Sequence, residues 1–478
     1  MIPVKYHLTK DLMPDKPTRL QLENAAADKD AFDHIVVMPD VHPKPGRKCP
    51  TGTVLASLDK ILPQVMDTAP NCGMRLYTTP WGQGDLKEAQ IEKLFNELVK
   101  AVPTRTYIGS LIDKKTVMGI CRFGEKALLE FLGEDPSKTQ NVFKQGNFFD
   151  TPPTQKDILD AIPKIFLWFA RFRLGIQGEA GNHFLDLMKI DEVLDKEKAE
   201  ILGLKKDQYV FLSHTGSGVM GQYCSYFFTP KKEEHLSMKI ITNLGRLTFN
   251  SKLLSKNQIK ELQKEVKKYR EKIEFFKIDP DSKRGKAYLL SHWASANFGF
   301  ANRSMIMYNI KKTIKKVFQK QVDFNLICDI PHVFVDREKH FGRQVWVHRN
   351  GATRAFGPSR MKQHPVFSQT GELGILAGSM STPSYLMASL DQNDSTFYSI
   401  NHGAGRKKKI SEAAVKTKEE LMKKMKKNKV KLYNAKSKGV IQQASGYYKN
   451  IDEIVKINKD FNISTPVVKL SPKSVLMA

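Results

Sequence analysis

The sequence lacks the long apolar segments that would place it across a membrane. No stretch approaches the ~18 consecutive apolar residues that a spanning helix needs. The opening MIPVKYHLTKDLMPDK also lacks the apolar centre of a secretory signal. We therefore expect a cytoplasmic protein that has no membrane partner.

Paired cysteines are absent as well. The chain has five cysteines, an odd number, and no two of them form a CxxC pair. This pattern is not typical of a disulfide framework and suits a reducing cytoplasm, where any one of the thiols could bind a metal. The five are Cys49, Cys72, Cys121, Cys224 and Cys328.

Acidic residues are scarce relative to basic ones. The chain has 50 Asp and Glu against 77 Lys and Arg, a formal net charge of +27. A surplus of this size favours a polyanionic partner, nucleic acid first and an anionic membrane surface second. The 478 residues contain no internal repeat or low-complexity linker, and they suffice for one large or two modest domains.

Apolar periodicity predicts strands and turns in the first 80 residues, helices over 86–133 and a loop over 134–156. Two lysine-rich helices are predicted further on. The first begins with a capping box at Ser255 and Gln258, and the second covers about 411–429. A solvated charged face explains either helix alone, but the net charge leads us to expect that at least one lines a phosphate track.

Chemistry concentrates in histidines that lie where a strand-like run meets a small-residue turn. The stretches are GEAGNHFLDL with Asn182 and His183, LSHTGSGVMG with His214, CDIPHVFVD with His332 and NHGAGR with His402. A lone histidine of this kind is usually structural, but four alike favour a transition-metal site, to which Cys72 in APNCGMRL would add a thiolate. A thiolate can bridge two ions, and ligand softness alone makes zinc a serious candidate.

Several stretches in this order resemble the RtcB-type RNA-splicing ligases: MPDVH, NCGMRL, GNHFLDL, HTGSG, NFGFANR, HRNGATRAF, GSMSTPSY and NHGAGR. The resemblance runs from about 36 to 406, with a weaker echo in GYYKNIDEIVKI. It implies an α+β fold with a single large mixed catalytic domain over 1–478. Within it we expect a basic helical excursion over 250–320 and a lysine-rich segment over 405–478 that completes the nucleotide site.

The resemblance also implies a reaction. Two Mn²⁺ ions and GTP would support the joining of an RNA 3′-phosphate or 2′,3′-cyclic phosphate end to a 5′-hydroxyl end, in tRNA splicing or RNA repair. The RNA partners would be tRNA halves or cleaved RNA, and the resemblance leaves open whether an archease-like activator is required.

Roles follow by position. His402 matches the nucleophile that attacks the α-phosphorus of GTP and holds GMP as a phosphoramidate, and its flanking glycines let the ring project. The residues that match metal ligands are Cys72, the bridging one, with His183, His214 and His332. Those that match nucleotide contacts are Asn182, Asp186, Ser379, Ser384, Gly405 and Tyr448. The candidate grips on RNA phosphate are Arg303, Arg349, Arg354 and Arg406, and a structural ion pair is the alternative for the first three.

Three positions depart from the family pattern. The family has an aspartate three residues before the metal cysteine, where this sequence has Ala69, so the nearest carboxylate, Asp67, becomes a candidate ligand. Asp186 replaces a glutamate that receives the guanine edge, and Met477 replaces a terminal lysine that contacts guanine. These changes predict a divergent branch with altered nucleotide preference, metal occupancy or nucleic-acid end.

Two alternatives remain beside ligation. A guanylyltransferase would cap RNA or DNA 3′-phosphate ends without efficient sealing, and a non-catalytic homologue would only bind nucleic acid. A metallophosphoesterase is disfavoured because it would use water in place of the presented histidine.

Overall fold

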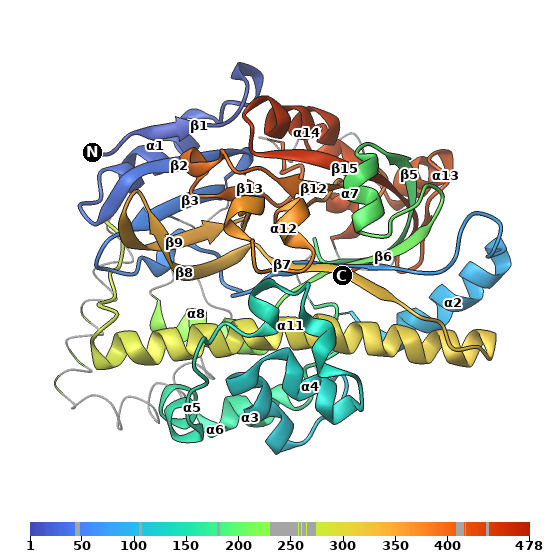
Figure 1. Cartoon of the computed structure of the whole chain (residues 1–478), viewed down its shortest axis with the longest axis horizontal. Coiled ribbons are helices and arrows are strands. Elements are labelled where there is room, and N and C mark those ends of the chain that lie inside the picture. Colours follow the sequence, from blue (N-terminus) through green and yellow to red (C-terminus); the bar gives the residue numbers. More distant parts are fainter. Residues whose placement is uncertain are drawn as a thin grey trace.

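The computed structural model describes residues 1–43, 48–104, 108–178, 182–229, 274–407, 415, 417–435 and 439–478, together with 257, 260 and 264. Within these residues, two layers of strands lie on one side of a long helix, α11, and shorter helices lie on its other side (Figure 1). The mixed α+β fold predicted from the sequence is confirmed.

The largest sheet described has eight strands and carries the candidate site at one end. Its path is β11-β12-β15-β5-β6-β4-β7, and β14 pairs with β15 beside that path. In β6, Val210 and Leu212 enter one apolar core while Phe211 enters another, because successive side chains of a strand point to opposite faces. The strands are β4 (Gly73–Thr78), β5 (Phe184–Val193), β6 (Tyr209–Thr215), β7 (Asn325–Pro331), β11 (Leu373–Leu376), β12 (Ser384–Ser389), β14 (Lys431–Leu432) and β15 (Ser464–Met477).

A five-stranded sheet and a two-stranded sheet complete the strand layers. The larger has the order β1-β2-β3-β9-β8, with β1 parallel to β2 and the other pairs antiparallel. The smaller pairs β10 with β13 and leads directly into His402. The strands are β1 (Val4–Tyr6), β2 (Ala31–His42), β3 (Thr51–Ser57), β8 (Val333–His340), β9 (Arg343–Asn350), β10 (Ala352–Arg354) and β13 (Ser399–Asn401).

Helix α11 (Lys283–Phe318) is the longest helix of the helical layer among the described residues. It starts at Ser282, whose hydroxyl accepts the Gly285 N–H, and ends at Gln319, which adopts a left-handed conformation with φ 53°. The other helices are α1 (Lys16–Ala26), α2 (Glu88–Ala101), α3 (Lys114–Phe123), α4 (Glu125–Leu132), α5 (Gln155–Ala161), α6 (Lys164–Ala170), α7 (Lys196–Ile201), α8 (Gly218–Phe228), α12 (Phe367–Thr370), α13 (Lys418–Lys427) and α14 (Ile451–Asp460).

The structure refines several sequence expectations. The helices predicted over 86–133 are present as α2, α3 and α4, with a non-helical stretch between α2 and α3 over 102–104 and 108–113, whereas α1 interrupts a stretch predicted to hold strands and turns. The loop predicted over 134–156 contains two short 3₁₀ segments, Pro136–Thr139 and Phe143–Gly146. Most side chains of α11, which falls within the range 250–320, are buried.

The two predicted lysine-rich helices are only partly visible. The helix with the capping box at Ser255 lies outside the described residues except for 257, 260 and 264, which are helical. Of the range 411–429, α13 accounts for Lys418–Lys427. None of the helices in the described ranges combines the length and apolar character required to cross a membrane.

Buried histidines make stability depend on pH. His348 is fully buried; its Nδ1 contacts Leu55 O at 3.1 Å, and its Nε2 accepts the Leu62 N–H at 2.9 Å. Burial lowers the pKa of His348 from 6.5 to about 4. The unfolded chain therefore binds a proton that the folded chain refuses as the pH falls below 6.5. We expect His348 to contribute up to about 3 kcal/mol above pH 6.5 and to lose that contribution progressively towards pH 4.

Urea unfolding of the wild type and of His348→Gln at pH 7.5 and pH 4.5 measures this contribution. The variant should be less stable at pH 7.5 and should lose less stability on acidification than the wild type does. Equal losses in the two proteins would contradict the assignment. Burial also lowers the pKa of His292, to about 3, so some pH dependence should remain in the variant.

Candidate metal centre

Four predicted ligands lie at one end of four neighbouring strands. β4 and β5 begin where their antiparallel partners β6 and β7 end, and Gly73, the first residue of β4, pairs with both Thr215 and Pro331. The first residues of β4 and β5 and the last residues of β6 and β7 therefore meet at the same end of these strands. The residues at this edge are Cys72, His183, His214 and His332.

The donor atoms of Cys72, His183 and His214 converge, and His332 borders this group through His214. Cys72 Sγ lies 3.3 Å from His183 Nε2 and 3.3 Å from His214 Nε2. His214 Nε2 is in turn 3.3 Å from His332 Nε2. The donor atoms of Cys72, His183 and His214 all lie within 4.8 Å of one another.

Backbone carbonyls fix two of the rings. His183 Nδ1 contacts Gln177 O at 2.9 Å, and His214 Nδ1 contacts Asn182 O at 3.0 Å. A carbonyl can only accept, so each Nδ1 carries the proton and each Nε2 presents its lone pair to the cluster. Gln177 also donates its side-chain N–H groups to Phe184 O and His214 O, which ties the two ligand-bearing strands together.

The environment of His214 and His332 favours the neutral imidazole. Burial lowers the pKa of His214 and of His332 well below the usual range, and the neighbouring imidazoles repel added charge. Metal ligands must be deprotonated, so this cluster is ready to bind a cation. Ligands about 2.0 to 2.3 Å from a tetrahedral ion stand about 3.5 Å apart, close to the separations seen here. The residues therefore fit a transition metal, and donor chemistry alone suits zinc as well as manganese.

His402 lies beside the cluster, with its ring centroid 4.7 Å from that of His332. Its Nδ1 is 2.8 Å from Asp40 Oδ2 and 2.8 Å from Gly351 O. The Asp40 side chain is fully buried, whereas the His402 ring remains 15% exposed. A buried carboxylate that holds the Nδ1 proton leaves Nε2 as the nucleophilic atom, the arrangement known from activated histidines. Sequence reasoning missed Asp40, although the motif MPDVH contains it.

The turn after His402 is built around Asp40. Gly405 adopts φ 69°, and a Cβ there would come within 2.2 Å of Asp40 O, so this position requires glycine. The His402 and Ala377 backbones contact through Ala377 N–H and His402 O at 3.3 Å. Lys449 Nζ donates to Pro39 O and Val41 O on either side of Asp40.

Several predicted nucleotide contacts lie in segments that touch this turn. Arg406 pairs with Tyr448 through a β-bridge, and its guanidinium stacks 5.0 Å from the Tyr448 ring. Ser379 and Ser384 stabilise the loop after Ala377: the Ser384 hydroxyl accepts the Gly378 N–H, and the Ser379 hydroxyl bonds that of Thr382. Asn182 is exposed next to His183.

Asp186 differs from the others because it is buried on β5. Burial raises the pKa of its carboxyl group well above the usual range. Among the described residues its Oδ1 has no hydrogen-bond partner. A buried orphan carboxyl oxygen is costly, so this atom is a candidate for contact with a bound group.

Arg303 and Arg349 do not fit their predicted contact with RNA phosphate, because both guanidinium groups are fully buried. Arg303 bonds Asp329, Asn71 O and Thr215 O, so it clamps the loop before Cys72 to the end of β6. The structural alternative considered from the sequence therefore describes these two arginines.

Arg349 pairs with Glu338 and bonds the Ser399 hydroxyl, three residues before His402. Arg354 is largely buried and forms a bidentate pair with Glu372. Both side chains therefore hold protein segments near the site. Arg406 is also partly exposed, and its guanidinium donates to Gln442 O and Gln443 Oε1.

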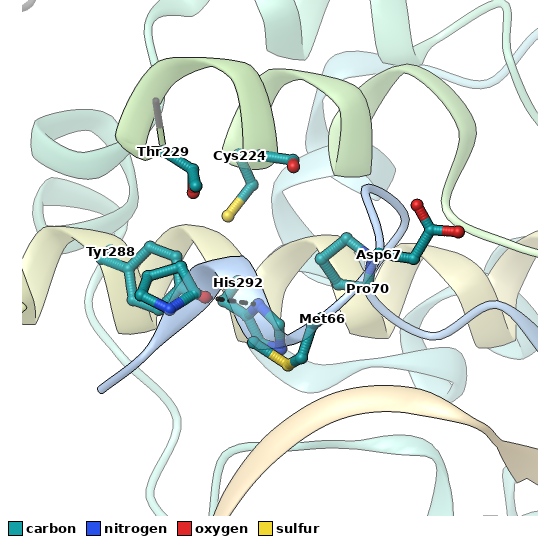
Figure 2. A pocket seen from close by; sticks show the side chains of 9 residues that line it. Met66, Asp67, Pro70, Cys224, Thr229, Tyr288 and His292 are labelled. Atoms are coloured by element: carbon teal, nitrogen blue, oxygen red, sulfur yellow. Dashed lines mark hydrogen bonds between the residues drawn. The ribbon is translucent and has the colours of Figure 1, made fainter. Parts of the chain in front are cut away.

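Asp67 is not a member of the Cys72 cluster. Its Oδ1 accepts the Thr68 N–H at 2.7 Å, and the residue lines a separate small pocket with Cys224, Tyr288 and His292. Figure 2 shows its carboxylate turned away from His292 and Cys224. Ala69, which replaces the family's aspartate, leaves the cluster without that carboxylate.

Comparison with known proteins gives a consistent result. The family model described as tRNA-splicing ligase RtcB matches residues 21–478. A tRNA-splicing ligase RtcB from Nanoarchaeum equitans is 26% identical, over 99% of this chain and 95% of the relative. Proteins of the same name from Methanococcus maripaludis and Archaeoglobus fulgidus are each 28% identical; the matches cover 85% and 99% of this chain, and 80% and 94% of those relatives.

Proposed function

Because the chain belongs to the RtcB family of tRNA-splicing ligases, we propose that it joins broken RNA with GTP as the energy source. The substrates are an RNA 3′-phosphate or 2′,3′-cyclic phosphate end and a 5′-hydroxyl end. The observation that carries the proposal is His402, which projects beside the Cys72 cluster with its Nδ1 held by buried Asp40.

His402 performs the first step. Its Nε2 attacks the α-phosphorus of GTP, a nitrogen–phosphorus bond forms, and pyrophosphate leaves. The Nδ1 proton stays on the ring and is held by Asp40, which stabilises the positive charge that the ring acquires.

The remaining steps move GMP and then release it. A 2′,3′-cyclic phosphate end is first opened by water, which breaks the bond to the 2′-oxygen and gives a 3′-phosphate. An oxygen of the 3′-phosphate then attacks the GMP phosphorus and frees His402. The 5′-hydroxyl then attacks the RNA phosphorus, loses its proton and displaces GMP as the new phosphodiester forms. Cleavage of GTP is thereby coupled to the bond that is made.

The ligands Cys72, His183, His214 and His332 would hold Mn²⁺, two ions by analogy with the family. Bound cations would neutralise negative charge that builds on the phosphoryl groups. Around them, the segments with Asn182, Asp186, Ser379, Ser384, Gly405, Arg406 and Tyr448 would surround the nucleotide.

Radiolabelled GTP tests the proposal directly. The purified protein, freed of metal and resupplied with Mn²⁺ or Zn²⁺, is incubated with α-labelled GTP, and the adduct is located by mass spectrometry. We expect GMP on His402, acid-labile as a phosphoramidate is, and transfer of the label to an RNA 3′-phosphate. A protein that gives no covalent adduct under any of these conditions would overturn the proposal.

Adding the 5′-hydroxyl strand separates ligation from capping. Sealed RNA with free GMP supports ligation, whereas a stable GMP cap on the 3′ end supports the guanylyltransferase alternative. The observation that keeps capping as the alternative is Ala69, which replaces the family's metal-binding aspartate.

A further inference from the structure

Helix α6 is apolar on two opposite faces. Phe166, Leu167 and Ala170 are buried in the core of the helical layer. Ile165, Trp168 and Phe169, at the intervening helical positions, remain 41%, 43% and 37% exposed. A helix that is apolar all round is normally buried, so an open second face marks a binding surface.

The surface continues beyond the helix. Phe172 follows one turn after Trp168, and the rings of these two residues contact each other with centroids 5.2 Å apart. The segment that carries Leu111 runs alongside, with Ser110 N–H bonded to Leu174 O, and Leu111 is 61% exposed. We call the surface of Leu111, Ile165, Trp168, Phe169 and Phe172 the aromatic ledge. It lies on the side of α11 away from the sheets (Figure 1).

Cations border these rings. Lys164 precedes the ledge on α6, and Arg171 lies between Trp168 and Phe172, with its guanidinium 5.6 Å from the Phe172 ring. Arg171 Nε donates to Ile112 O, which places exposed Lys114 and Lys115 at the same border. The nearest carboxylate in this segment, that of Asp113, is engaged by the Thr116 N–H as a helix cap.

Exposed rings bordered by cations suit one class of partner best. A single-stranded nucleic acid offers bases that stack on aromatic rings and phosphates that pair with Lys and Arg. The net charge of +27 favours the same partner. An acidic protein segment would match the cations, and a second copy of the chain would match the apolar side chains, but neither needs both features together.

The ledge is also connected to the candidate metal centre. The backbone from Phe172 reaches Gly178 in six residues, a span of at most about 20 Å. Gly178 is packed against His183, since a Cβ there would lie 2.9 Å from His183 Nδ1. Bonds from Gly175 and Ile176 N–H to the Asn302 side chain hold this segment against α11. An RNA strand of modest length could therefore occupy both places.

We propose that the aromatic ledge stacks the bases of single-stranded RNA whose end lies at His402. This inference rests on the proposed ligase function and specifies where its substrate binds.

The fluorescence of Trp168 can be used to measure RNA binding to the ledge. It is the exposed member of the four tryptophans, since Trp81 and Trp293 are partly buried and Trp346 is 5% exposed. A single-stranded RNA 12-mer with a 3′-phosphate should quench its fluorescence. Anisotropy with the labelled 12-mer should show about tenfold weaker binding for Trp168→Ala, partial rescue in Trp168→Phe, and unchanged affinity in Phe131→Ala, which removes a ring of similar exposure on α4.

Adduct formation with labelled GTP distinguishes this inference from the proposed function. Trp168→Ala should form the His402 adduct at the wild-type rate while its KM for RNA rises and its kcat changes little. If adduct formation is intact and the RNA affinity of Trp168→Ala equals that of the wild type, the ledge is not an RNA surface. Light scattering then shows whether Trp168→Ala dissociates an oligomer, the outcome that would assign the ledge to a second copy. If the wild type forms no adduct, the ligase proposal itself is contradicted.

Discussion

Replacement of His402 by alanine is expected to eliminate the GMP adduct and to lower RNA joining by at least about 10³-fold. The imidazole supplies the nitrogen of the nitrogen–phosphorus bond. Among the described residues that border it, no other side chain can replace it as the nucleophile, because His332 and His214 point their Nε2 atoms at each other, 3.3 Å apart. The measurement is the rate of label transfer from α-labelled GTP to protein. His364→Ala, which removes a histidine whose Nε2 contacts Gln140 O, is the matched control.

Asp40 should show a graded effect at the same step. Asp40→Asn keeps the side-chain size but offers either an amide N–H or an oxygen to Nδ1, so the ring loses its charge partner and can adopt the wrong tautomer. A loss of about 10²- to 10⁴-fold in adduct formation is expected, with metal content unchanged. Wild-type rates in Asp40→Asn would mean that the Gly351 carbonyl alone positions the ring.

The convergence of the site could be predicted only in part from the sequence. Cys72, His183, His214 and His332 share a local pattern that signals ligands, but the pattern does not say that they meet. They meet because the β4, β5, β6 and β7 pairings are antiparallel, and this register pairs residues as far apart in the sequence as Gly73 and Pro331. Asp40 was missed for the same reason: it lies 362 residues from His402.

The arginines show the opposite difficulty. In the sequence, Arg303, Arg349 and Arg406 are equivalent cations near glycines and small residues. Burial separates them, because a fully buried guanidinium must pair with carboxylates or carbonyls and cannot meet a phosphate from solvent. Arg303 and Arg349 find Asp329 and Glu338, whereas Arg406 remains at the surface. Helix α11 falls within the expected basic excursion over 250–320, yet most of its side chains are buried.

Removal of the thiolate is expected to weaken both metal binding and adduct formation. Cys72 Sγ contacts both His183 Nε2 and His214 Nε2, so Cys72→Ala removes the central member of the cluster. We expect metal binding at least about a hundredfold weaker and a comparable loss of adduct formation, since even the outer partners of metal ligands are worth 10- to 100-fold. Metal content measured by mass spectrometry after dialysis against a fixed Mn²⁺ concentration checks this. Cys121→Ala, in the core of the helical layer, controls for loss of a buried thiol.

The metal content of Asp67→Asn tests whether the Asp67 carboxylate is a metal ligand. Asp67 bonds its own loop at Thr68 and lines a pocket with His292, outside the Cys72 cluster, so its amide variant should keep the wild-type metal content. Loss of metal in Asp67→Asn would show instead that the carboxylate turns towards Cys72 when an ion binds.

Ala69→Asp restores a carboxylate three residues before Cys72. This added ligand should tighten Mn²⁺ binding, since hard oxygen ligands favour manganese over zinc. Gly221 of α8 packs closely against the Ala69 backbone, since a Cβ on Gly221 would lie 3.2 Å from the Ala69 Cα.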